Sequence, residues 1–118
     1  MEPTQVKTER SVTLIGKNGQ AQGILADLST ESAGVQSPRG AQVGTELELV
    51  FEIPTAEYFR ELRILGKVTH RHNTSLGAYL KLQFEAISPL QRQYINEFIA
   101  YKQRLAELGK KSRRQDYR

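Results

Sequence analysis

The segment from Asp27 to Val35 gathers side chains suited to binding chemistry. Asp27 and Ser29 carry oxygens that accept or donate hydrogen bonds around a turn, and Gly34 permits backbone conformations that a Cβ atom would forbid. The segment lies between a strand predicted to end at Asp27 and another predicted to begin near Gly34. Because these residue types are also common in turns that bind nothing, the pattern predicts a structured turn and leaves a ligand role open.

A second polar cluster, His70-Arg71-His72-Asn73, stands at the end of a predicted strand. His70 and His72 are two residues apart and share a strand face, as a pair of metal ligands would. No carboxylate or third histidine lies nearby in the sequence, so we predict no metal site here. Arg71 remains a candidate for reaching a phosphate from the rim of the fold.

The sequence offers no catalytic machinery that we recognise. It has no cysteine, which excludes disulfides, zinc–cysteine sites and a cysteine nucleophile. It also shows no nucleophile–base pair and no glycine-rich phosphate loop. We therefore predict that the protein is not an enzyme and holds no metal or cofactor.

The basic excess of the chain is confined to its C-terminal end. The 118 residues carry a formal charge of +4. Residues 102–118 hold seven Lys/Arg against two Asp/Glu, whereas residues 1–101 hold ten against eleven. The near-neutral body argues against nucleic-acid binding, although a basic tail acting with a barrel surface remains an alternative. The N-terminus has no signal-peptide pattern and no apolar run could span a membrane, which predicts a cytoplasmic protein of one domain.

Apolar and polar residues alternate along residues 45–53, 62–71 and 78–84, as they do in half-buried strands. Shorter strands are predicted around Asn18-Gly19, which supplies the two positive-φ positions of a tight hairpin, and near residues 34–37. No long helical crossover separates these segments. The fold class is therefore mostly β, with about six antiparallel strands closed into a barrel. Residues 55–59 also suit a single turn of helix.

The apolar period changes at Ser88, where Ser88-Pro89-Leu90-Gln91 matches a capping box with proline at the first helical position. Apolar residues then recur every three or four positions, which predicts a helix over residues 88–108 that ends at Gly109. This stripe consists of Leu90, Tyr94, Phe98, Tyr101, Leu105 and Leu108. We expect it to cap the barrel or to extend into an oligomer contact. The predicted organisation is a flexible arm (1–9), a barrel with its C-terminal α-helix (10–108) and a disordered basic tail (109–118).

In this order of elements the chain resembles the PilZ domain, a bacterial six-stranded barrel followed by a C-terminal helix. The resemblance covers roughly residues 8–105. The hallmark of the family is an Asp/Asn-x-Ser-x-x-Gly turn after the second strand, and Asp27 and Ser29 match it. Ser32 stands where the glycine is expected, and Gly34 follows two residues later.

The resemblance implies a receptor for cyclic di-GMP, a bacterial second messenger. The family binds it with this turn and with an Arg-x-x-x-Arg pair before the first strand, where the planar fork of arginine fits a guanine edge or a phosphate. Arg10 matches the second arginine, Val6 stands in place of the first, and Lys7 lies one position away. The ligand-binding set that the resemblance implies is Lys7, Arg10, Asp27, Ser29, Ser32, Gly34 and Arg71.

Two functions follow from this resemblance. The leading hypothesis is a small signalling adaptor that binds cyclic di-GMP, orders its N-terminal arm around the ligand and relays the signal to an unidentified protein partner. The alternative is a degenerate PilZ domain that binds no nucleotide and acts only through protein contacts. The missing arginine and Ser32 favour this alternative.

Overall fold

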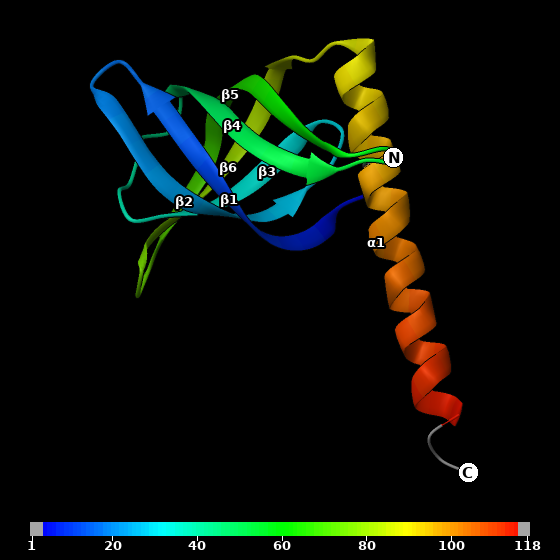
Figure 1. Cartoon of the computed structure of the whole chain (residues 1–118). Helices are drawn as coiled ribbons and strands as arrows, with labels where there is room; N and C mark the ends of the chain where they lie inside the picture. The colour runs from blue at the N-terminus through cyan, green and yellow to red at the C-terminus, as the bar shows by residue number, and fades with distance from the viewer. Residues whose placement is uncertain (1–3, 116–118) are drawn as a thin grey trace.

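Six antiparallel strands form a closed barrel, and one long helix follows them (Figure 1). The computed structural model describes residues 4–115. The elements are β1 (Val6–Gly16), β2 (Gly19–Leu28), β3 (Ser32–Ser37), β4 (Glu46–Pro54), β5 (Phe59–Thr74), β6 (Gly77–Ala86) and α1 (Pro89–Gln115). Around the barrel the order is β1-β2-β3-β6-β5-β4, and β4 pairs back to β1. The predicted fold class is confirmed.

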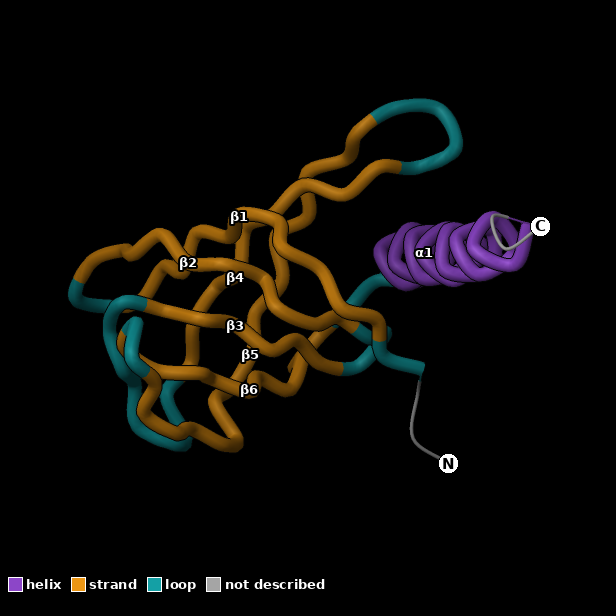
Figure 2. Tube along the Cα trace, turned by 90° about the horizontal axis from the view of Figure 1, so that it is seen from below, coloured by secondary structure: helices purple, strands orange, loops and turns teal. Residues whose placement is uncertain are grey.

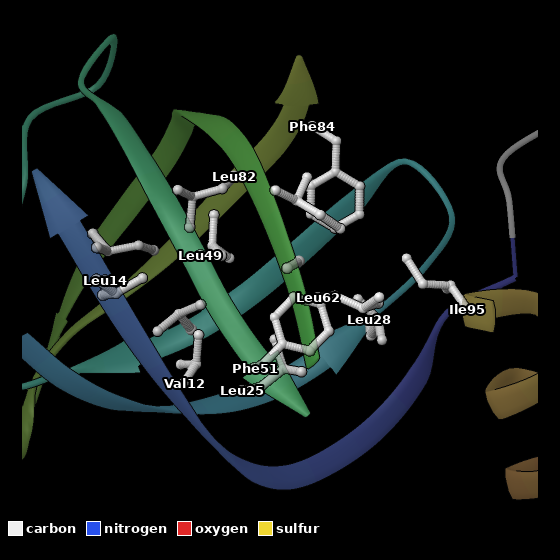
Figure 3. Close-up of a cluster of buried hydrophobic side chains, with 14 of the residues drawn as sticks. Val12, Leu14, Leu25, Leu28, Leu49, Phe51, Leu62, Leu82, Phe84 and Ile95 are labelled. Carbon is white, nitrogen blue, oxygen red and sulfur yellow. The ribbon is translucent and has the colours of Figure 1, made fainter. Parts of the chain in front are cut away.

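The barrel is filled by the inward side chains of its strands, because successive residues of a strand point to opposite faces. Val12, Leu25, Leu49 and Leu82 are among these buried residues (Figure 3). Ile95 of α1 joins the same cluster at one end of the barrel. The alternation in the sequence therefore identifies the face of each strand that forms the core.

Strand β1 begins earlier than predicted. Val6 pairs with Leu28 and packs against the core, so residues 6–9 belong to the barrel and the prediction of a flexible arm is wrong for them. The register shifts between Lys7 and Arg10, which marks a β-bulge. A bulge adds a residue to one strand and so changes the face on which the following side chains lie. Residues 1–3 of the predicted arm lie outside the described residues.

Two turns differ from the expectation. The β1–β2 hairpin turns at Lys17 and Asn18, and positive φ occurs at Gly19 alone, at 132°. The prediction that Asn18 and Gly19 both adopt positive φ is therefore wrong, and glycine carries the strained position. Between β4 and β5, the Thr55 hydroxyl donates to the Tyr58 carbonyl at 2.6 Å and closes a turn, with no turn of helix.

The capping box at the start of α1 is confirmed. Ser88 Oγ accepts a hydrogen bond from Gln91 N at 3.0 Å, and Gln91 Oε1 accepts one from Ser88 N at 3.0 Å. The Gln91 amide also donates to the Arg63 carbonyl of β5 at 3.0 Å. The same side chain thus satisfies the helix end and ties it to the barrel.

The face of α1 that packs on the barrel is rotated from the predicted stripe. Ile95, Phe98 and Ile99 are buried, whereas Tyr101 and Leu105 are exposed. The residues of α1 that are buried all lie in its first half, and its second half extends past the barrel on one side (Figure 1), while Figure 2 shows the helix beside one end of the barrel. The last three members of the predicted stripe therefore do not cap the barrel, and the predicted alternative, an oligomer contact, stays a prediction.

The helix also continues beyond its predicted end. Gly109 lies inside α1 without positive φ, and the helix reaches Gln115. Lysine, arginine and glutamine have good helix propensity, so a single glycine does not stop the helix here. The predicted disordered tail is therefore wrong for residues 109–115, and residues 116–118 lie outside the described residues. Over residues 4–115, no helix is both long enough and apolar enough to cross a membrane.

Candidate functional site

The β2–β3 turn is organised around the hydroxyl of Ser29. Its Oγ accepts hydrogen bonds from Ser32 N at 3.0 Å and from Glu31 N at 3.2 Å, and the Ser29 backbone N donates to the Ser32 carbonyl at 2.9 Å. Ser29 is only 1% exposed. Because the hydroxyl replaces water as the partner of two backbone N–H groups, the turn is rigid before any ligand arrives.

Ser32 does not strain this turn. It opens β3, and no residue other than glycine has positive φ in the described chain. Glycine is favoured over other residues mainly where φ is positive or space is short. The replacement of the family's glycine by Ser32 therefore leaves the backbone of the turn in an ordinary conformation.

Asp27 sits at the end of β2 with its carboxylate already partnered. Tyr79 Oη donates to Asp27 Oδ2 at 2.6 Å, and Lys81 Nζ lies 3.3 Å from Asp27 Oδ1. The Asp27 side chain is 10% exposed. Burial, and then the hydrogen bond to Asp27, hold the pKa of Tyr79 well above its ordinary value, so its phenol stays protonated and keeps donating.

Gly34 serves this contact by leaving space. A Cβ atom at this position would overlap both the Tyr79 hydroxyl and the Asp27 carboxylate. Its φ is not positive, so the expectation that Gly34 supplies a special backbone conformation is wrong. Because Gly34 of β3 has no side chain, Tyr79 of β6 can reach across β3 to Asp27 of β2.

The strand register aligns a row of residues across the outside of the barrel. Lys7 pairs with Asp27, Asp27 with Gly34, Gly34 with Lys81, and Lys81 with His70. We call these five residues the outer row. Directly paired residues of neighbouring strands share a face, so the row places two lysines and one carboxylate together. The combination carries an excess of positive charge suited to an anion.

Arg10 does not join the outer row. Its Nε donates to the Glu52 carbonyl of β4, and its guanidinium lies 5.2 Å from the centroid of the Phe59 ring. Lys7 is exposed on β1, whereas Arg10 is partly buried and contacts β4 and β5. A role for Arg10 in the same site requires it to leave these two partners.

Of the other predicted cluster, only His70 lies in the outer row, and Arg71 lies apart from Asp27. Arg71 donates to Asn73 Oδ1 at 3.0 Å and packs over Gly40 in the β3–β4 loop. The His72 ring stacks on the Tyr79 ring, with centroids 5.1 Å apart. The predicted set of site residues therefore divides into a group around Asp27, namely Lys7, Ser29, Ser32 and Gly34, and two separate arginines.

Sequence reasoning missed Tyr79 and Lys81. Alternation already placed both on the outer face of their strand. What the sequence did not reveal is that β3 pairs with β6, which brings these side chains over Gly34 to Asp27. The signal that could have found them is the pair of polar, outward residues flanking Leu80 on a strand predicted to close the barrel.

The barrel, the Ser29 turn and the C-terminal helix together define the class of protein as a small six-stranded barrel with one helix, and comparison with protein families identifies it further. The family model for the PilZ domain matches residues 5–101. The chain therefore belongs to the PilZ domain family, a family of cyclic di-GMP receptors that act as regulatory adaptors. A search of curated protein sequences finds no match.

Solved structures show the same fold at low sequence identity. The Bacillus subtilis inhibitor of motility MotI/DgrA matches with a TM-score of 0.76 and 16% identity, over 87% of this chain and 51% of that protein. The PilZ domain of CeSA from a cellulose-synthesizing bacterium matches with a TM-score of 0.57 and 13% identity, over 81% of this chain and 94% of that chain. The Borreliella burgdorferi PlzA protein in complex with c-di-GMP matches with a TM-score of 0.53 and 12% identity, over 88% of this chain and 52% of that chain. The chain thus spans about half the length of two of these proteins.

Proposed function

We propose that this chain is an adaptor that binds cyclic di-GMP on the outer row and passes the signal to a protein partner. The observation that carries the proposal is that Asp27, next to the Ser29 turn, lies beside two lysines on the outside of the barrel. Membership of the PilZ family and the likeness to PlzA, whose structure contains c-di-GMP, support it. Nothing in this function requires bond chemistry.

The chemistry of the ligand suits the outer row. Cyclic di-GMP is a dianion with two guanines, and its phosphates would lie against the lysines. Each guanine presents N–H donors that a carboxylate such as Asp27 accepts, since each oxygen of Asp27 has a lone pair to spare beyond its present partner. Arg10 would complete the site by leaving Phe59 and stacking on a base or forking onto a phosphate.

A groove connects the outer row to the helix. Val6 and Lys7 of β1 face Lys102, Leu105 and Ala106 of α1 across a groove of about 440 Å³. Lys7 belongs to both the groove and the outer row, so a ligand that draws Lys7 toward a phosphate alters the groove. We propose that the protein partner binds along the second half of α1, where Leu105 is exposed, and that the change in the groove alters this binding.

The alternative, a domain that acts through protein contacts without nucleotide, is favoured by one observation. Asp27 and Arg10 already have partners within the protein, since Tyr79 and Lys81 contact Asp27 and the Glu52 carbonyl accepts from Arg10. A ligand must compete with these contacts. Val6 packs against the core, so an arginine placed there would not restore the outer face, and Lys7 is the better position for one.

Titration calorimetry with cyclic di-GMP tests the proposal. We expect binding in the micromolar range or weaker, about −8 kcal/mol at 1 μM. Lys7→Arg should tighten it, because a fork replaces a point charge. Lys17→Arg is the matched control, since Lys17 is an exposed lysine in the β1–β2 turn, at the barrel end away from α1 (Figure 1). Absence of heat and of amide shifts at millimolar ligand in all three proteins would establish the alternative instead.

A further inference from the structure

Lys81 lies in the outer row between Gly34 and His70, and not all of its hydrogen-bond donors are used. Its Nζ lies 3.0 Å from Gln5 Oε1 and 3.3 Å from Asp27 Oδ1. A lysine ammonium has three donors, so one of them has no protein partner among these contacts. The side chain is 24% exposed, which places the charge at the edge of solvent and within reach of a ligand.

The two partners of Lys81 differ in charge and in burial. Asp27 is a buried carboxylate that needs a cation, whereas the Gln5 amide is neutral and exposed. Hydrogen bonds between an ammonium and an anionic oxygen are shorter and stronger than those to a neutral amide oxygen. A phosphate oxygen that replaced Gln5 Oε1 would therefore improve the Lys81 contacts while the pair with Asp27 stayed intact.

We propose that Lys81 of β6 binds a phosphate of the ligand. Lys81 thereby supplies the positive charge that the first arginine of the family motif would supply at the position of Val6. The inference rests on the proposed function and adds to it a residue outside the Arg-x-x-x-Arg and Asp-x-Ser segments. Gly34 makes it feasible, because β3 contributes no side chain of its own between Lys81 and Asp27. Gln5 Oε1 marks the position that the phosphate oxygen takes beside Lys81.

The partial burial of Lys81 makes its charge more effective than that of a surface lysine. Coulomb interactions strengthen as the effective dielectric constant falls toward that of the protein interior, and buried pairs are screened less by salt. Lys7 is exposed and sits at the β1 end of the row. We therefore assign the stronger phosphate contact to Lys81 and the weaker, more salt-sensitive one to Lys7.

Charge variants of Lys81 test the assignment by calorimetry with cyclic di-GMP. Lys81→Gln keeps a hydrogen-bonding group but removes the charge, and we expect it to weaken binding at least tenfold. Lys81→Arg keeps the charge and should retain affinity within about threefold, on the scale where a tenfold change is about 1.4 kcal/mol. Gln5→Ala removes the competing partner and should bind as tightly as the wild type or up to a few fold more tightly. Lys17→Gln, far from the row, should change nothing.

A spectroscopic readout separates binding from folding. The ¹⁵Nζ resonance of Lys81 should shift when cyclic di-GMP is added, and thermal unfolding of each variant checks that the barrel is intact. Equal affinity of Lys81→Gln and wild type would overturn the assignment while leaving the proposed function standing. Equal loss in Lys81→Gln and Lys81→Arg, with unchanged melting temperatures, would overturn it too. If the wild type itself does not bind, the proposed function fails first and the assignment falls with it.

Discussion

Gly34→Ala tests whether the contact between Tyr79 and Asp27 depends on empty space over β3. A Cβ at residue 34 overlaps the Tyr79 hydroxyl and the Asp27 carboxylate, so one or both must move. Overpacking costs about 1–3 kcal/mol. Loss of the hydrogen bond to a charged partner costs about 1.5–3 kcal/mol. Since relaxation recovers part of both, we expect the free energy of unfolding to fall by about 2–4 kcal/mol.

A double-mutant cycle shows where this cost arises. Tyr79→Phe removes both the hydroxyl that the new Cβ would meet and the hydrogen bond that it would break. Gly34→Ala should then cost less in the Tyr79→Phe background than in the wild type, by at least about 1 kcal/mol, as expected for residues that share a contact. The assay is urea unfolding followed by circular dichroism. Additive effects of the two substitutions would refute the role assigned to Gly34.

Three further predictions concern the turn, the tyrosine and the helix end. Ser29→Ala leaves two backbone N–H groups unpaired and should cost about 1–3 kcal/mol in urea unfolding, while Ser32→Ala, which keeps those bonds, should cost far less. The raised pKa of Tyr79 means that the native state holds this proton more tightly than the unfolded chain. The free energy of unfolding should therefore fall as the pH rises past the ordinary tyrosine value of 10.0, and fall less steeply in Tyr79→Phe. Gly109→Ala meets nothing within 4 Å and should raise helix content in far-UV circular dichroism, with little change in melting temperature.

The sequence predicted the barrel well because its strands have one buried face. The alternation of residues 45–53 and 78–84 identified the inward residues, and the capping box located the start of α1. The pairing between strands could not be predicted in the same way. Nothing in the order of residues says that β3 lies against β6, and without that pairing Lys81 has no reason to be linked to Asp27.

The errors share a physical cause. A β-bulge has no signature in the hydrophobic pattern, so the register of Lys7 and Arg10 against β2 could not be assigned from the sequence. The length of α1 and the face that it buries depend on where the barrel ends, and the barrel supports only the first half of the helix. The motif residues Asp27 and Ser29 were found because their chemistry is local to one turn.

Arg10 can bind the ligand only if its side chain leaves its present partners, one of which is Phe59. A substitution at Phe59 therefore tests the role of Arg10. Phe59 and Tyr58 are both 55% exposed in the β4–β5 hairpin, but Phe59 stacks on Arg10 whereas Tyr58 stacks on Arg60. An exposed cation–π contact is worth about 0.5–1 kcal/mol. If Arg10 must leave Phe59 to hold cyclic di-GMP, Phe59→Ala removes that competing contact and should tighten binding about two- to fivefold, on the scale of about 1.4 kcal/mol per tenfold. Tyr58→Ala, which frees Arg60 instead, should leave the affinity unchanged. Equal affinities of Phe59→Ala, Tyr58→Ala and wild type would mean that Arg10 keeps its contacts with β4 and β5 in the complex, and that the lysines of the outer row bind the phosphates without it.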